Sequence, residues 1–354
     1  MSIRVLVVDD SAFMRKAISM MLESDPDIEV ISTARDGMEA TEKARDLKPD
    51  LMTMDVEMPR MDGITAVKKI MKENPIPILM VSSLTVEGAR ATMDALAAGA
   101  VDFIPKQLSY VSLDITKIKG DLIAKIKSIA RDRSRAFSRL VSPKTFAPRK
   151  ASPLKFLSAQ IATIGISTGG PFSLQKVIPF LPEDFPLPIA IVQHMPPHFT
   201  RSLAERLDSI SRVEVCEAED GMELKKGTVY IAPGGLHLKF KRIGVKVLIN
   251  ISKDPSDSLH RPSVDVMFSS AFETFGGRVL ATVMTGMGKD GLEGAKLIKS
   301  AGGKIIAQNE ETCVVYGMPK AIVDAELADA VLPLEEIASA ISNAVSTTAA
   351  PVNS

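Results

Sequence analysis

Short apolar runs alternate with amphipathic segments along the first part of this 354-residue chain, and this alternation constrains the fold more than any other feature. A strand that is buried on both faces appears in a sequence as a nearly continuous run of Val, Ile, Leu and Met, and helices between such strands favour parallel connections. The alternation therefore predicts a doubly wound α/β domain with a five-stranded parallel sheet. The apolar runs are residues 3–10, 28–34, 50–57, 76–83 and 100–106.

A second αβ pattern begins near residue 157 and predicts a second domain, which we expect to be Rossmann-like, with α/β/α layers around a mostly parallel sheet. The segment between the two patterns is rich in Arg, Lys, Ser and Pro and has little apolar periodicity, which is typical of an exposed linker. Because it lacks interleaved aromatic residues, a solvated tether is a better interpretation than a nucleic-acid contact. The expected organisation is a first domain over residues 1–125, a linker over 126–156 and a second domain over 157–346.

The composition excludes several classes of protein. Lys and Arg together number 43, as do Asp and Glu, so the chain has no net basicity that would suggest a nucleic-acid partner. The 2 cysteines, Cys216 and Cys313, give no disulfide framework. No apolar stretch approaches the roughly 18 residues of a membrane span, and the N-terminus has no signal-peptide pattern. We therefore expect a soluble cytoplasmic protein without membrane insertion.

Polar side chains stand at the carboxyl ends of the strands predicted in the first domain, where ligands bind in doubly wound sheets. Asp9 and Asp10 end the first apolar run, and Asp55 ends the third. Crowded carboxylates repel each other unless a cation lies between them, and hard oxygen ligands suit Mg²⁺. Ser82 and Lys106 add a hydroxyl and an ammonium group, so the cluster could bind a phosphoryl group carried on Asp55. An alternative role in helix capping accounts for Asp10 alone.

The motifs "VDDS", "MDVEMPRMDG", "MVSS" and "DFIPK" resemble those of a response-regulator receiver domain, over residues 3 to about 122. The resemblance implies a flavodoxin-like fold in which Asp55 accepts a phosphoryl group from a histidine kinase. It also implies that Asp10, Asp55 and the backbone carbonyl of Glu57 hold Mg²⁺, with Asp9 in the same acidic site.

The same resemblance implies a conformational switch in the first domain. Ser82 and Phe103 match the pair of residues whose positions report phosphorylation in receivers, and Lys106 belongs to the same switch.

Ser167 stands in a loop that is suited to a nucleophile. It lies between Gly165 and Gly169, in a G-x-S-x-G pattern that follows an apolar strand and precedes a helical pattern. The first N–H groups of that helix lack partners within the helix, so they favour negative charge beside them. Gly170 lets the backbone come close to a bound group, and Pro171 suits the first helical turn. The pattern alone is weak. The interpretation as a phosphate-binding loop is weaker still, because the sequence matches neither G-x-G-x-x-G nor G-x-x-x-x-G-K-[ST].

A serine nucleophile needs a base, and the chain has 4 histidines. His194 follows the apolar run "PIAIVQ", so we expect it at the tip of the strand beside Ser167. His198 is separated from His194 by two prolines, which argues against a shared helix face that could bind zinc. His237 on a predicted hairpin and His260 in a loop are interpreted as structural.

The base needs an acid that fixes its tautomer. Asp290 follows the apolar run and glycine loop "RVLATVMTGMGK" and precedes a helical pattern. An alternative is that Asp290 only caps that helix. Three strand ends that carry Ser, His and Asp favour a catalytic row, and the glycine loop could turn a backbone N–H, that of Met287, toward an oxyanion.

These residues carry a second resemblance, over about residues 158–345. The motifs "GISTGGP", "VQHMPPHFT", "YIAPGGLHL", "HRPSVDVMFSSAF", "MTGMGKDG" and "VVYGMPKAI" are similar to those of chemotaxis-specific protein-glutamate methylesterases, the CheB family. The resemblance implies Ser167 as nucleophile, His194 as general base and acid, and Asp290 as its orienter, with Thr168 lending its N–H to the oxyanion.

The implied function is a phosphorylation-activated hydrolase that cleaves glutamyl methyl esters on chemoreceptors, with deamidation of receptor glutamines as a further activity. The implied partners are the receptors and a chemotaxis histidine kinase, and the esterase reaction itself needs no cofactor. An alternative is a receiver-controlled response regulator that binds a partner or DNA without catalysis. A DNA-binding output would show a basic recognition helix, which the second half lacks.

Overall fold

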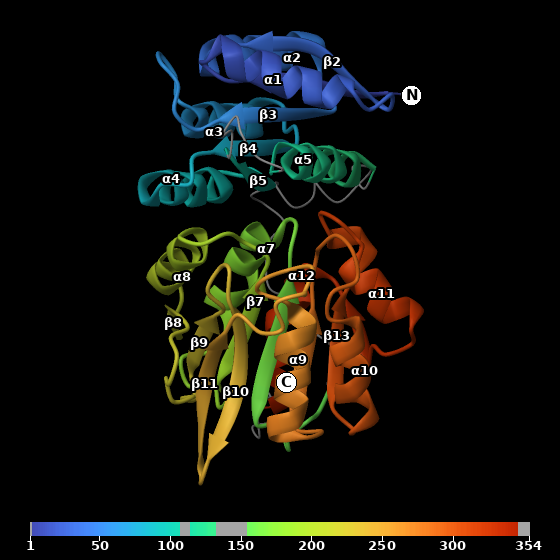
Figure 1. Cartoon of the computed structure of the whole chain (residues 1–354). Coiled ribbons are helices and arrows are strands. Elements are labelled where there is room, and N and C mark those ends of the chain that lie inside the picture. The colour runs from blue at the N-terminus through green and yellow to red at the C-terminus, as the bar shows by residue number, and fades with distance from the viewer. Residues whose placement is uncertain (1, 107–113, 132–153, 346–354) are drawn as a thin grey trace, which may run out of the picture. The chain divides into compact units, whose positions relative to one another are not determined.

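The computed structural model describes residues 2–106, 114–131 and 154–345 (Figure 1). The chain divides into two compact units, Met1–Thr145 and Phe146–Ser354, and each unit has a parallel sheet of its own. No helix within the described residues is both long and apolar enough to cross a lipid bilayer.

The sheet of the first unit has five parallel strands in the order β2-β1-β3-β4-β5. Every residue of β3 and β4 is buried, which explains why these strands are continuous apolar runs. The order reverses between β1 and β3, so their carboxyl ends border the position where doubly wound sheets bind ligands. The predicted five-stranded α/β fold is confirmed. The strands are β1 (Ile3–Val8), β2 (Ile28–Ala34), β3 (Leu51–Asp55), β4 (Ile78–Ser82) and β5 (Asp102–Pro105).

Polar N-caps define where the first four helices begin. The side chains of Ser11, Asp36, Asp62 and Thr85 each accept a backbone N–H from the first turn. α1 packs against α5, whereas α2 contacts α3 and α3 contacts α4. The helices are α1 (Ala12–Glu23), α2 (Gly37–Leu47), α3 (Gly63–Glu73), α4 (Val86–Ala97) and α5 (Asp114–Arg131).

α5 continues past residue 125, the expected end of the first domain. Leu122, Ile126 and Ile129 on this helix are buried, and Lys127 forms ion pairs with Asp25 and Asp27. Residues 126–131 of the expected linker are therefore helical, and Ile126 and Ile129 within them are packed. The rest of that linker up to residue 153, like residue 346, lies outside the described residues.

The sheet of the second unit has seven parallel strands in the order β14-β13-β12-β6-β7-β9-β8, which confirms the predicted Rossmann-like class. A separate antiparallel hairpin, β10–β11, packs against α9. The strands are β6 (Ile161–Ile166), β7 (Ile189–Gln193), β8 (Glu214–Glu217), β9 (Thr228–Ile231), β10 (His237–Ile243), β11 (Lys246–Ser252), β12 (Val279–Val283), β13 (Lys304–Gln308) and β14 (Ala330–Leu332).

Helices cover this sheet. α9 packs against α10 and α10 against α11, and α9 and α10 stand side by side in Figure 1. α7 instead packs against α8 and α12. The helices are α7 (Gly170–Val177), α8 (Phe199–Ile210), α9 (Val264–Phe275), α10 (Leu292–Ser300), α11 (Met318–Asp324) and α12 (Leu334–Val345), with 3₁₀ turns η1 (Ile178–Phe180) and η2 (Glu310–Thr312).

β6 occupies the middle of the sheet. Gly165 near its carboxyl end is in register with Val283 of β12 on one side and with Val192 of β7 on the other. The chain segments that follow these three strands therefore leave the sheet at the same edge, where side chains distant in the sequence can meet.

Candidate functional sites

Ser167 directly follows β6, and backbone hydrogen bonds fix its position. Its N–H donates to the Thr285 carbonyl at 3.0 Å, and its own carbonyl accepts the Gly170 N–H at 2.8 Å, so the chain turns at once into α7. The turn requires glycine at Gly169, which has φ +76° and faces the Val314 side chain. The half-buried Ser167 hydroxyl is thus held at the sheet edge.

The His194 ring joins the serine to an acid. Its Nδ1 lies 3.1 Å from Ser167 Oγ, and its Nε2 lies 2.7 Å from Asp290 Oδ2. A carboxylate only accepts, so Nε2 carries the proton and Nδ1 offers a lone pair to the serine hydroxyl. His194 and Asp290 side chains are only 10% and 9% exposed. The structure therefore brings the three predicted residues into one hydrogen-bonded row.

Asp290 is held by the N-terminus of α9. Its carboxylate accepts the Ser263 hydroxyl at 2.9 Å and the Val264 and Asp265 N–H groups at 2.7 and 2.9 Å. Burial alone would raise the pKa of Asp290, but the hydrogen bonds and charge of His194 and the α9 N–H groups outweigh it and hold this pKa well below its usual value. The alternative that Asp290 only caps the following helix is wrong, because α10 begins after Gly291 with no side-chain cap.

His260 and His237, which the sequence predicts to be structural, support this row. The His260 ring stacks on the His194 ring with centroids 4.2 Å apart. The buried His237 accepts the Ser263 N–H at Nδ1, at 3.3 Å, and its Nε2 lies 3.1 Å from the Pro255 carbonyl. Burial lowers the pKa of His237 and favours this neutral form.

Two further residues, His198 and Ser263, lie directly before helices, but only Ser263 caps its helix with its side chain. His198 immediately precedes α8 with a positive φ of 71°, and its side chain makes no capping bond. Ser263 directly precedes the helical pattern "VDVMFSSAF", which is an N-cap signature that sequence reasoning missed. No sequence signal indicates the stacking of His260.

The loop after β12 lies against the nucleophile. A Cβ on Gly286 would stand 2.8 Å from the Ser167 Cβ, so the loop approaches closely only because this residue is glycine. Gly286 is anchored by its N–H to the Val315 carbonyl at 3.0 Å, and the half-buried Met287 follows it. Thr168 is buried, and its carbonyl accepts the Thr285 hydroxyl at 2.9 Å.

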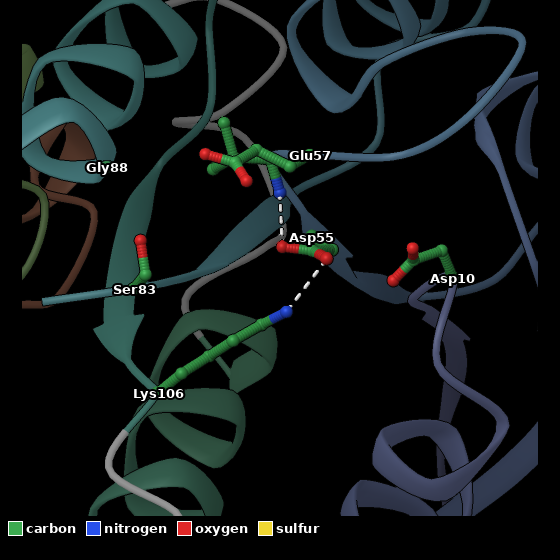
Figure 2. A pocket seen from close by; sticks show the side chains of 7 residues that line it. Asp10, Asp55, Glu57, Ser83, Gly88 and Lys106 are labelled. Atoms are coloured by element: carbon green, nitrogen blue, oxygen red, sulfur yellow. Dashed lines mark hydrogen bonds and ion pairs between the residues drawn. The ribbon is translucent and has the colours of Figure 1, made fainter. Parts of the chain in front are cut away.

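An acidic pocket of about 240 Å³ lies at the carboxyl edge of the first sheet. Figure 2 shows the Lys106 side chain reaching toward Asp55, with Asp10 on the other side of Asp55. Lys106 Nζ lies 2.7 Å from Asp55 Oδ2 and 2.9 Å from Asp9 Oδ2. The pocket is lined by Asp10, Asp55, Val56, Glu57, Ser83, Gly88 and Lys106.

Burial and charge act against each other in this pocket. Burial raises the pKa of Asp55, and the nearby Asp9 adds to the rise, although Lys106 opposes it. The pKa of Lys106 is also raised, because its contacts with Asp55 and Asp9 outweigh burial, which alone would lower it. Asp55 thus lies among groups that do not fully offset its negative charge.

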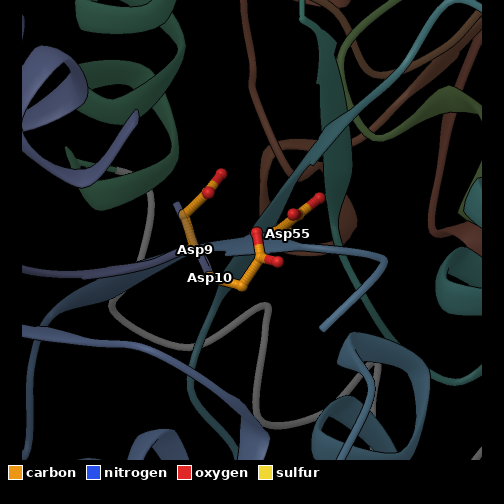
Figure 3. Close-up of side chains that lie close together, drawn as sticks. All are labelled: Asp9, Asp10 and Asp55. Carbon is orange, nitrogen blue, oxygen red and sulfur yellow. The ribbon is translucent and has the colours of Figure 1, made fainter. Parts of the chain in front are cut away.

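The donor set of this pocket fits a hard divalent cation. Asp9, Asp10 and Asp55 each offer one oxygen, and these atoms all lie within 4.8 Å of one another (Figure 3). Carboxylate oxygens without thiol or imidazole partners suit Mg²⁺. Glu57 lines the same pocket with its side chain exposed.

Two of the predicted switch residues, Ser82 and Phe103, are buried and do not line the pocket, whereas the third, Lys106, does. Ser82 is 1% exposed and accepts a hydrogen bond from the Thr92 hydroxyl at 2.7 Å, while its own hydroxyl donates to the Gly88 carbonyl at 3.1 Å. The next residue, Ser83, lines the pocket instead, and sequence reasoning missed it. Phe103 is 4% exposed in β5.

Two family models match the chain. The model described as "CheB methylesterase" matches residues 162–341, and the one described as "Response regulator receiver domain" matches residues 5–115. These matches fall on the second and first units, respectively.

Curated relatives match nearly the whole chain. A protein of Oleidesulfovibrio alaskensis named "Protein-glutamate methylesterase/protein-glutamine glutaminase 1" is 50% identical, and the match covers 97% of this chain and 99% of that protein. A Thermotoga maritima protein named "Protein-glutamate methylesterase/protein-glutamine glutaminase" is 49% identical, with 95% and 96% covered. The crystal structure of the Thermotoga maritima CheB methylesterase catalytic domain is 50% identical, with a TM-score of 0.51 and with 52% of this chain and 97% of that chain covered.

Proposed function

This chain belongs to the CheB methylesterase family, and from that premise we propose that it hydrolyses glutamyl methyl esters of chemoreceptors with Ser167, His194 and Asp290 as its catalytic row. The observation that carries the proposal is the pair of contacts at the His194 ring, 3.1 Å to Ser167 Oγ and 2.7 Å to Asp290 Oδ2. A serine hydroxyl becomes an effective nucleophile when a base takes its proton and an acid orients that base.

The reaction follows from these positions. Ser167 Oγ attacks the ester carbonyl while His194 Nδ1 takes the hydroxyl proton, and Asp290 stabilises the resulting imidazolium. The imidazolium then gives its proton to the departing methoxide, so methanol leaves and a glutamyl-serine ester remains. Water attacks this ester with His194 again as base, which releases the glutamate carboxylate and restores the serine hydroxyl.

The negative charge that develops on the ester carbonyl needs donors. Thr168 directly follows the nucleophile, and Met287 follows Gly286, whose Cα closely approaches Ser167. We assign the oxyanion to the backbone N–H groups of Thr168 and Met287. A single donor of this kind contributes a factor of about 10²–10³ in kcat.

The same row is suited to hydrolysis of a glutamine side chain. The curated relatives are named as glutaminases as well as methylesterases. In this reaction His194 protonates the departing amine, so ammonia leaves in place of methanol and the products are again a serine ester and then glutamate. We propose this deamidation as a second activity of the site.

The receiver unit supplies regulation. Asp55 accepts a phosphoryl group from a chemotaxis histidine kinase, and Asp9, Asp10, Asp55 and the Glu57 carbonyl would hold the Mg²⁺ that this reaction requires. The ion neutralises the crowded carboxylates when it is bound. Lys106, Ser82 and Phe103 respond to the new phosphoryl group, and esterase activity rises. We propose the cytoplasm as the location of this activity.

Methanol release from a purified methylated receptor tests the proposal. The wild type should release methanol, and acetyl phosphate with Mg²⁺ should increase the rate. Ser167→Ala should abolish release, by a factor on the order of 10⁶ as for other serine nucleophiles, whereas exposed Ser209→Ala should not change it. Turnover that survives in Ser167→Ala would exclude the catalytic row and leave a non-catalytic regulator as the better account.

The regulatory part has a separate test. Asp55→Asn should keep the unstimulated rate of methanol release and lose the stimulation by acetyl phosphate, because the carboxylate that takes the phosphoryl group is gone. Equal stimulation of this variant and the wild type would contradict the assignment of Asp55 without touching the catalytic row.

A further inference from the structure

Two donors hold the carbonyl of the peptide that joins Ser167 to Thr168. The Ser167 carbonyl accepts the Gly170 N–H at 2.8 Å and the side-chain Nε2 of Gln193 at 3.0 Å. A carbonyl oxygen has two lone pairs, so both are used. Gln193 is the last residue of β7, next to His194, and none of its contacts is explained by the reaction steps above.

The surroundings of Gln193 fix which way its amide points. Nε2 also donates to the His194 carbonyl at 3.3 Å, so two carbonyl oxygens face the same nitrogen. The reversed amide would set its own oxygen against both of them, which is repulsive. Gln193 is 1% exposed, and its Oε1 is buried without a hydrogen-bond partner in the described part of the chain. Leaving that oxygen unpaired costs stability, which indicates that the Nε2 contacts matter.

Gly170 leaves room for this arrangement. A Cβ built on Gly170 would overlap the Gln193 Oε1. Any larger residue at Gly170 would push the amide away from the Ser167 carbonyl. The glycine pair at the start of α7 therefore accommodates a buried glutamine as well as a tight turn.

The held carbonyl determines where the Thr168 N–H points. Both groups belong to one planar trans peptide, in which C=O and N–H point in opposite directions. Two bonds that fix the carbonyl therefore direct the Thr168 N–H away from Gln193. This N–H has no acceptor among the residues that the structure describes, so it is available to a bound oxygen. Rotation of the peptide would break both bonds at the Ser167 carbonyl.

We propose that Gln193 is a positioning residue that keeps the Thr168 N–H directed at the oxyanion. The proposal rests on the proposed esterase function, because it specifies how one oxyanion donor is oriented. Gln193 acts through the backbone of the nucleophile loop, because its side chain donates to the Ser167 and His194 carbonyls. Its removal should weaken transition-state stabilisation without changing the protonation behaviour of the catalytic row.

The test uses the full chain with Gln193→Met, which keeps the side-chain length and removes the donor. We expect kcat for methanol release to fall about 10- to 100-fold, with KM changed less than about threefold and the pH profile unmoved, since a misaligned oxyanion donor acts on the transition state. Titration with a fluorescent fluorophosphonate should still count about one reactive serine per chain, with a slower rate constant of labelling. A damaged fold would instead reduce the number of reactive sites.

Two further variants complete the test. Gly170→Ala, which displaces the amide instead of removing it, should give the same loss of rate with the same number of sites. Thr163→Val removes a buried hydroxyl of β6 that has no hydrogen-bond partner among the described residues, and it should leave kcat unchanged. Wild-type kcat in Gln193→Met or Gly170→Ala would overturn the role of Gln193, and so would a loss of sites at an unchanged rate constant. Absence of wild-type turnover or of labelling at Ser167 would instead overturn the proposed function.

Discussion

Asp55 and Asp290 are both nearly buried carboxylates at the carboxyl edge of a parallel sheet, yet their surroundings act in opposite directions. Asp55 stands close to Asp9 and Asp10, the Lys106 ammonium pairs with Asp55 and Asp9, and burial raises the pKa of Asp55. Asp290 accepts four donors, three of them at the N-terminus of α9, and its pKa is lowered. The two carboxylates share their residue type and their place in the fold, so the number of donors around each explains why their pKa values shift in opposite directions.

This difference agrees with the two proposed roles. A carboxylate that must accept a phosphoryl group has to keep an accessible oxygen, and it needs a cation to offset its neighbours. A carboxylate that orients a histidine has to stay ionised and immobile, which a full set of donors provides. Crowded carboxylates thus destabilise the receiver site, whereas the hydrogen bonds to Asp290 stabilise the esterase site.

Asp290→Asn should produce the largest effect. The amide cannot hold the His194 tautomer as the carboxylate does, so kcat for methanol release should fall by a factor of about 10⁴. Asp324→Asn, on the exposed end of α11, is the control and should keep full activity. A kcat within about tenfold of wild type for Asp290→Asn would mean that the acid only supports the structure.

Mg²⁺ should stabilise only the first unit, which contains the acidic pocket around Asp55. At about 100 times its dissociation constant, an ion that binds only the folded protein stabilises it by about 2.7 kcal/mol. Hydrogen exchange measured by mass spectrometry should show slower exchange in residues 3–106 and no change in residues 161–345. Asp10→Asn should weaken this protection. Protection that is equal in both units, or unaffected by this variant, would contradict a Mg²⁺ site at the acidic pocket.

Acid should destabilise the unit that contains Asp290. Because its pKa is lowered in the fold, its contribution is present above the ordinary value of 3.8 and is lost as the pH falls through the folded value. A group of this kind contributes on the order of 2 kcal/mol. Urea titrations between pH 6 and 3 cover the first part of this loss and, followed by the methionine methyl NMR signal of Met267, should show a smaller loss in Asp290→Asn. An equal loss in both proteins would contradict the stabilising network.

Asp55→Asn should give the smallest effect, and it should raise rather than lower the free energy of unfolding. The pKa of Asp55 is raised, so its contribution is fullest below the ordinary value and is lost as the pH rises through the folded value. Removing the charge at pH 7 should therefore stabilise the first unit, which the urea midpoint of the Met80 methyl signal would report as a rise. Destabilisation would show that the ion pair with Lys106 outweighs burial.

Much of the fold could be predicted from the sequence, because buried parallel strands are continuous apolar runs and polar N-caps precede the helices. The family resemblance is confirmed by the matches over nearly the whole chain. Ser167, His194 and Asp290 could be selected because chemistry-bearing residues followed strands that share one sheet edge. The end of each strand can be recognised from the local sequence, and the parallel topology brings these ends to the same edge of the sheet.

The remaining features depend on side-chain orientation that the sequence does not encode locally. The stacking of His260 on His194 and the contact between His237 and Ser263 arise from the path of the loop before α9. Ser82 and Ser83 are adjacent and chemically identical, yet Ser82 is hydrogen-bonded to Thr92 and Ser83 lines the pocket. The continuation of α5 to Arg131 follows from its packing on α1, since the sequence there is rich in charge.

The most direct test of the catalytic row is to map fluorophosphonate labelling of the full-length chain by peptide mass spectrometry. The account predicts a single labelled serine, Ser167, with labelling that is strongly slowed in His194→Ala and unaffected by Asp55→Asn. Label on another serine, or labelling of Ser167 at the wild-type rate without His194, would contradict the claim that this hydroxyl is activated by the imidazole and carboxylate beside it.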